Sequence, residues 1–205
     1  ALPPVGAQRP VEAGMEGRRR ERRGFDRAAE QRLSGREALG ACRQTFFVNR
    51  GGWDHHNEVR ASQDAMLPEV DDAIGALWAA LVAMGVQDQV VLYSASDFGR
   101  TLTSNARGSD HAWGGNQFVL GGAVAGRKIY GQYPSLAVNP ESGSEVNPLD
   151  TGRGRFIPTT SVDAFFAEMA LWLGVPPGSL PLVLPNIGNF YTPNTGSPPL
   201  GFLMA

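Results

Sequence analysis

The chain contains only one cysteine, Cys42, among its 205 residues. A single thiol excludes an intramolecular disulfide bond and a zinc site built from several cysteines. Long apolar runs are also missing, because none reaches the roughly 18 residues that a membrane-spanning helix needs. A large excess of charge is missing too, since the formal net charge is −2. We therefore expect no membrane partner, and nucleic acid is a poor candidate partner.

The remaining composition is that of an ordinary folded protein. Hydrophobic residues make up 42% and charged residues 19% of the chain, which is typical of globular domains. A chain of 205 residues is long enough to bury one sizeable core. Composition thus predicts one main domain but indicates neither a substrate nor an oligomeric state.

The basic residues are concentrated at one end of the chain. Ten of the 18 Lys and Arg residues fall within residues 1–43, and all ten are arginine. We predict an Arg-rich arm over residues 1–40 and a folded domain over residues 41–205. Three interpretations of the arm stay open: a disordered or weakly helical segment, a stretch that is not authentic coding sequence, or a nucleic-acid-binding arm. Further charge follows Arg18–Arg20 instead of an apolar run, so a secretory signal of an exported parent would lie upstream.

Apolar patterning predicts strands that alternate with helices. Short apolar runs bounded by turn residues predict three buried strands: Gln44–Asn49, Gln89–Ala95 and Gln117–Leu120. Between the first two runs, apolar residues recur at three- and four-residue steps and predict a long helix: Met66, Val70, Ile74, Leu77, Trp78 and Leu81. This order favours an α/β fold with a mostly parallel sheet flanked by helices.

Three further features complete the predicted secondary structure. Pro68 suits the first turn of the long helix or marks a kink in it. A second helix is predicted over Thr160–Leu173, with Thr160 and Asp163 spaced as in a capping box. The tail over residues 176–205 is rich in Pro, Gly and Asn, which predicts an extended segment.

All three histidines of the chain lie beside aspartates in predicted loops. These clusters are Asp54-His55-His56 and Asp110-His111, and Asp97 follows the second predicted strand directly. In parallel α/β sheets, functional residues gather in the loops beyond the strand ends. Imidazole and carboxylate groups bind zinc, manganese or iron where cysteine is lacking. The pattern therefore favours a shared metal site over isolated Asp–His hydrogen bonds. Arg100 is either an anion clamp or a partner in a surface salt bridge.

Four stretches carry a resemblance to a known family: Gly52–His56, Ser96–Thr101, Gly108–His111 and Pro185–Gly188. In this order and spacing, residues from about 44 to 190 resemble the C-terminal half of a bacterial family called domain of unknown function 1501. Members of that family are typically exported, often by the twin-arginine route. The family is similar to the alkaline-phosphatase and sulfatase superfamily.

The resemblance implies an alkaline-phosphatase-like fold that is N-terminally truncated in this chain, and a set of metal ligands. By position, Asp54, His56 and His111 resemble the ligands of one metal ion, and Asp97 resembles a ligand of a second. Asp110 resembles a ligand or a group that supports one. His55 stands where the family usually has threonine, so either His55 or His56 could face the metal.

The resemblance also implies a function. The expected activity is metal-dependent hydrolysis of phosphate or sulfate esters, on a small molecule or a polymer, with this chain an inactive or weakly active fragment. The alternative is a non-catalytic exported protein that binds metal or acts in assembly. We expect a divalent metal, with zinc favoured over manganese, iron and calcium, and a periplasmic or secreted location for the full-length parent.

Overall fold

The computed structural model describes residues 33–38, 40, 42–193 and 196–203. The chain divides into two compact units. Residues 1–50 and 66–85 form the first unit, and residues 51–65 and 86–205 form the second. Most of the predicted Arg-rich arm, residues 1–40, lies outside the described residues, so the arm stays a prediction.

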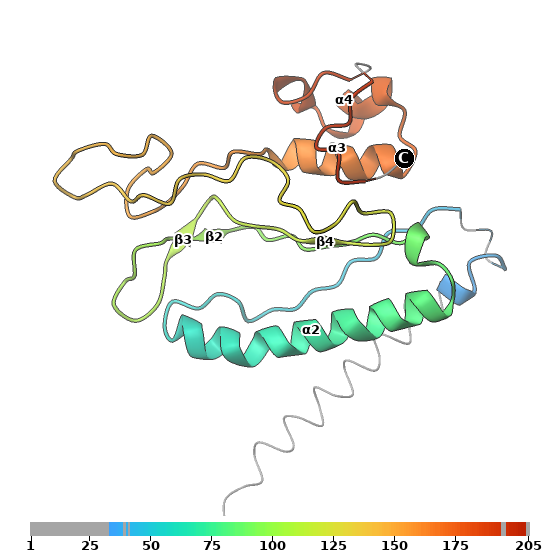
Figure 1. The fold of residues 1–205 in the computed structure, drawn as a ribbon, viewed down its shortest axis with the longest axis horizontal. Coiled ribbons are helices and arrows are strands. Elements are labelled where there is room, and N and C mark those ends of the chain that lie inside the picture. Colours follow the sequence, from blue (N-terminus) through green and yellow to red (C-terminus); the bar gives the residue numbers. More distant parts are fainter. Residues whose placement is uncertain (1–32, 39, 41, 194–195, 204–205) are drawn as a thin grey trace, which may run out of the picture. The chain divides into compact units, whose positions relative to one another are not determined.

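Among the described residues the longest helix is α2, which spans Val59–Ala83 (Figure 1). The predicted apolar stripe from Met66 to Leu81 is buried or half-buried along its whole length. The helix begins before the stripe, so Pro68 lies inside it and not in its first turn. Neither α2 nor another helix in the described part of the chain is long and apolar enough to cross a membrane.

The predicted parallel sheet is wrong. In the described residues the strands form two separate antiparallel pairs. Strand β1 (Leu92–Tyr93) pairs with β4 (Val119–Leu120), and β2 (Gly99–Arg100) pairs with β3 (His111–Ala112). The chain between β1 and β4 folds back on itself through the β2–β3 pair, so β4 runs beside β1 in the opposite direction. The alkaline-phosphatase-like α/β architecture that we expected is therefore not the observed fold.

The first predicted strand is wrong as well. Gln44–Asn49 has no strand structure, and Phe46, Phe47 and Val48 are exposed, with Phe47 at 90%. An apolar run identifies a segment suited to burial, but a strand forms only where a partner supplies its hydrogen bonds. The second and third predicted strands shrink to the two-residue strands β1 and β4.

Helix α3, Val162–Trp172, carries the core of the second unit. Its N-cap is Ser161, whose hydroxyl accepts a hydrogen bond from the Ala164 backbone N–H, so the predicted capping box at Thr160 is wrong. The predicted extended tail is also wrong, because it folds into the short helix α4 (Leu180–Val183) and two 3-10 turns, η2 (Pro177–Ser179) and η3 (Ile187–Asn189). Ala167, Leu180 and Ile187 are fully buried together in this core.

A buried carboxylate fastens the end of the chain to α3. Glu168 is 3% exposed. Its Oε2 accepts hydrogen bonds from the backbone N–H groups of Leu200 and Gly201, and its Oε1 accepts one from Leu203. Phe202 is buried in this segment and packs against Phe165 of α3. The three N–H donors therefore provide the hydrogen bonds that a buried carboxylate requires.

Candidate metal centre

The candidate site belongs entirely to the second unit, where two segments meet. One segment is the loop that precedes α2, and the other is the β2–β3 pair, in which Arg100 lies opposite His111. Arg100 joins the segments, because its Nη1 donates to the Ser109 carbonyl and its Nη2 to the Trp53 carbonyl, each at 2.6 Å. A backbone hydrogen bond of 2.7 Å from Glu58 N–H to the Arg107 carbonyl adds a second link.

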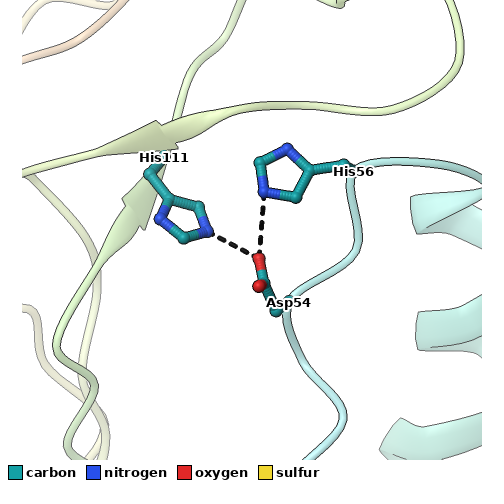
Figure 2. A group of neighbouring side chains, drawn as sticks. All are labelled: Asp54, His56 and His111. Atoms are coloured by element: carbon teal, nitrogen blue, oxygen red, sulfur yellow. Dashed lines mark hydrogen bonds and ion pairs between the residues drawn. The ribbon is translucent and has the colours of Figure 1, made fainter.

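Asp54, His56 and His111 converge at this junction (Figure 2). Asp54 Oδ1 lies 2.6 Å from His111 Nε2 and 3.1 Å from His56 Nε2. Each residue offers one ligand atom, and these atoms all lie within 4.8 Å of one another. The three residues could therefore hold a metal ion. Their side chains are between 45 and 63% exposed, so a small molecule can reach them.

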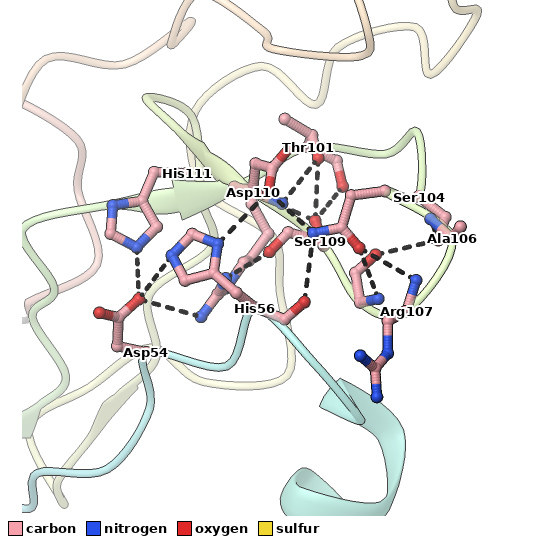
Figure 3. Close-up of polar contacts among 12 residues, drawn as sticks. Asp54, His56, Thr101, Ser104, Ala106, Arg107, Ser109, Asp110 and His111 are labelled. Atoms are coloured by element: carbon pink, nitrogen blue, oxygen red, sulfur yellow. Dashed lines mark hydrogen bonds and ion pairs between the residues drawn. The ribbon is translucent and has the colours of Figure 1, made fainter.

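Asp110 lies on the other side of the His56 ring (Figure 3). Its Oδ1 is 3.3 Å from His56 Nδ1 and accepts a hydrogen bond of 2.9 Å from the Asn105 side-chain amide. Its Oδ2 accepts one of 2.8 Å from Arg153. The hydrogen bonds from Asn105, Arg153 and His56 lower the pKa of Asp110 to about 2. Asp110 therefore stays ionised, and its Oδ1 can accept a hydrogen bond from a protonated Nδ1 of His56. The Nε2 atom of His56 is then free to coordinate a metal ion.

His111 is oriented by stacking. Its ring lies parallel to the Phe98 ring, with centroids 4.0 Å apart and an interplanar angle of 10°. The pKa of Asp54 is lowered mainly by its hydrogen bond with His111, and further by the charges of His111, His56 and Arg100. The negative charge of Asp54 is thus kept at the point where both imidazole rings meet.

The other predicted site residues lie outside this group. Asp97 is exposed and is not one of the three converging residues. His56, and not His55, lies beside Asp54. His55 Nε2 is buried without a hydrogen-bond partner among the described residues. Both amino groups of Arg100 donate to backbone carbonyls. Roles for Asp97 as a second metal ligand and for Arg100 as an anion clamp stay predictions.

Two residues of the site were missed by sequence reasoning. Asn105 donates both to Asp110 and to the His56 carbonyl, at 2.9 and 3.1 Å. Arg153 lies between Gly152 and Gly154 in a glycine-rich turn. Polar residues such as Asn105 are common in loops. Arg153 follows Asp110 at a separation of 43 positions with no periodic pattern between them, so no sequence signal marks these contacts.

A family model described as "Protein of unknown function (DUF1501)" matches residues 8–152 of the chain. The match includes the loop with Asp54 and His56, the whole β2–β3 pair and the turn up to Gly152. It begins earlier and ends earlier than the resemblance over residues 44–190. No curated protein and no solved structure matches the chain significantly.

Proposed function

Because this chain belongs to the DUF1501 family of proteins of unknown function, we propose a function from the site itself: it binds a divalent metal ion through Asp54, His56 and His111. The observation that carries the proposal is the convergence of these three ligand atoms within 4.8 Å. The Asp110 contact on His56 Nδ1 supports it, because metal-binding histidines commonly donate their second N–H to a carboxylate.

The ligand set favours zinc. Two imidazole nitrogens and one carboxylate oxygen suit zinc, with manganese and iron as the alternatives. Calcium is a poorer fit because it prefers a shell made only of oxygen ligands. Three protein ligands leave a coordination position for a water molecule or a substrate, which is typical of catalytic zinc sites and not of structural ones.

We further propose that the site hydrolyses phosphate or sulfate esters, of a small molecule or a polymer, weakly and with water as the nucleophile. A bound divalent ion would supply Lewis-acid polarisation of the ester oxygen. The nearby hydroxyls of Ser96, Thr101 and Ser109 all donate to backbone carbonyls, at 2.9, 2.9 and 2.6 Å. None of the three hydroxyl protons is therefore directed at a general base, and an activated hydroxyl is needed for fast turnover through a phosphoryl- or sulfuryl-enzyme.

Because these hydroxyl groups donate to backbone carbonyls, the structure also favours a second candidate function, which is metal binding without catalysis. A periplasmic or secreted location is part of both proposals. Kinship with the alkaline-phosphatase and sulfatase superfamily is proposed from the order of the motifs alone.

Metal content tests the first part of the proposal. After exhaustive dialysis, wild-type protein should retain about one zinc ion per chain by elemental analysis, because three ligands enclose the position. A His56→Ala, His111→Ala double variant should retain almost none. The matched control is His55→Ala, which removes a neighbouring imidazole outside the triad and should bind zinc like wild type. Equal metal in the wild type and the double variant contradicts the proposal.

Ester hydrolysis separates the two candidate functions. Aryl phosphate and aryl sulfate are assayed with added zinc or manganese, and Asp54→Ala serves as the blank. Slow turnover that depends on metal and is lost in Asp54→Ala supports the weak hydrolase. Metal binding without turnover above the blank supports the non-catalytic protein.

A further inference from the structure

The turn from Asp150 to Phe156 holds Arg153 in an unusual backbone conformation. Arg153 has a φ of 62°, and the glycines on either side of it, Gly152 and Gly154, have φ values of 102° and 70°. Asp150 fixes the turn, because its buried Oδ1 accepts the N–H groups of Gly152 and Gly154 at 2.8 and 2.9 Å. A left-handed φ is unfavourable for any residue that has a Cβ atom. We therefore expect that the side chain of Arg153 has a role that offsets this unfavourable conformation.

That side chain contacts Asp110. Arg153 Nη2 donates to Asp110 Oδ2 at 2.8 Å, while Asp110 Oδ1 faces Asn105 and the His56 ring. The two carboxylate oxygens thus have separate partners. Because Arg153 holds one oxygen, rotation of the carboxylate away from His56 Nδ1 would break a charge-assisted hydrogen bond.

Arg153 and Asp110 are both held by backbone hydrogen bonds to the same segment, residues 101–103. The carbonyls of Arg153 and Gly154 accept the N–H groups of Thr103 and Leu102, at 3.1 and 3.2 Å. Next along the chain, Thr101 N–H donates to the Asp110 carbonyl at 2.9 Å. Arg153 is therefore held at a fixed distance from Asp110 by the backbone itself, as a positioning group requires.

We propose that Arg153 is a positioning residue of the metal site, which acts through Asp110 to hold the His56 imidazole with Nε2 directed at Asp54 and His111. The inference rests on the proposed metal-binding function. It predicts an effect opposite to direct electrostatics, because a guanidinium repels a cation and its removal alone would tighten metal binding. Positioning predicts weaker binding when the guanidinium is removed.

The experiment measures zinc affinity by chelator competition in the full chain. Arg153→Met should weaken zinc binding about 10- to 100-fold, the usual effect of losing a group that supports a metal-binding histidine. Arg153→Lys, which keeps the charge and one donor, should recover part of the loss. The matched control is Arg107→Met, because that arginine is exposed and its side chain points away from Asp110 (Figure 3). In an Asp110→Ala background, Arg153→Met should change the affinity by less than about twofold.

A second readout concerns the metal-free protein. The imidazole N–H and C–H signals of His56 are identified in NMR spectra by their loss in His56→Gln. In Arg153→Met these signals should shift and broaden, whereas Arg107→Met should leave them unchanged. Unchanged His56 signals in Arg153→Met, or zinc binding as tight as in wild type or tighter, overturn the inference. A wild-type chain that binds no zinc but loses the His56 signal pattern in Arg153→Met would refute the proposed metal site and still support the orientation of His56 by Arg153.

Discussion

The substitution Glu168→Gln should strongly destabilise the second unit. Glutamine keeps the shape of the side chain but replaces one carboxylate oxygen with an NH2 donor. Its remaining oxygen can still accept the N–H groups of Leu200 and Gly201, but the new donor then faces the Leu203 N–H, which loses its partner.

The magnitude follows from these three hydrogen bonds. A hydrogen bond to a charged group contributes about 1.5–3 kcal/mol, and one between neutral groups about 0.5–1.5 kcal/mol. Two bonds weaken by about 1 kcal/mol each and the third is lost, so the free energy of unfolding should fall by roughly 3–5 kcal/mol. For a chain of this length, that lowers the Tm by about 10 °C.

Urea unfolding at neutral pH provides the assay. The transition is followed by the fluorescence of the four tryptophans, of which Trp172 lies in α3, and by circular dichroism. The two curves should coincide. The matched control is Glu145→Gln, which makes the same chemical change at an exposed position and should lie within about 0.5 kcal/mol of wild type. A Glu168→Gln variant as stable as this control would refute the reasoning that the buried carboxylate holds the end of the chain.

Three further predictions concern the site and its supporting turn. Asp110 has a folded-state pKa of about 2, below its ordinary value of 3.8. Its contribution to stability is therefore complete above about pH 4 and is lost as the pH falls toward 2. The Asp110→Asn variant should lack this part of the acid dependence of the urea midpoint. Phe98→Leu should weaken zinc binding about two- to tenfold, because an aromatic contact contributes about 0.5–1.5 kcal/mol beyond its buried area, whereas Leu at the exposed Phe190 should not change it. The substitutions Gly143→Ala and Gly154→Ala both place a Cβ atom at a positive φ, but only at Gly154 would this atom lie 2.6 Å from another side chain, that of Leu102. Gly154→Ala should therefore lower the free energy of unfolding by about 1–3 kcal/mol more than Gly143→Ala does, measured by thermal unfolding. Equal losses would contradict this packing.

Local patterns in the sequence were sufficient to predict α2 and α3 and to point to three residues that could hold a metal ion. The stripe from Met66 to Leu81 marks the inner face of α2, because helical periodicity depends only on neighbouring turns. Asp54, His56 and His111 could be named because histidine is rare in this chain and each cluster combines imidazole with carboxylate. The choice between His55 and His56 depends on backbone direction, which the sequence leaves open.

Long-range features could not be predicted in the same way. Whether β1 and β4 run parallel or antiparallel depends on the path of the 25 residues between Tyr93 and Val119. The composition of the two strands does not decide it. The exposed apolar run around Phe47 shows that an apolar pattern typical of a strand does not form one without a partner strand. Arg153 reaches Asp110 only through a turn set by Asp150 and two glycines, and such turns carry no periodic signal.

The short contact between Asp54 and His111 has a consequence for the energetics of the proposed metal binding. A hydrogen bond of 2.6 Å between Oδ1 and Nε2 requires a proton on the line that joins the two atoms. Nε2 cannot keep that proton and coordinate a metal ion, so binding must move the proton either to Nδ1 of the same ring or to the solvent. The heat of zinc binding in buffers of different ionisation enthalpy distinguishes the two, because it changes with the buffer only where a proton is released.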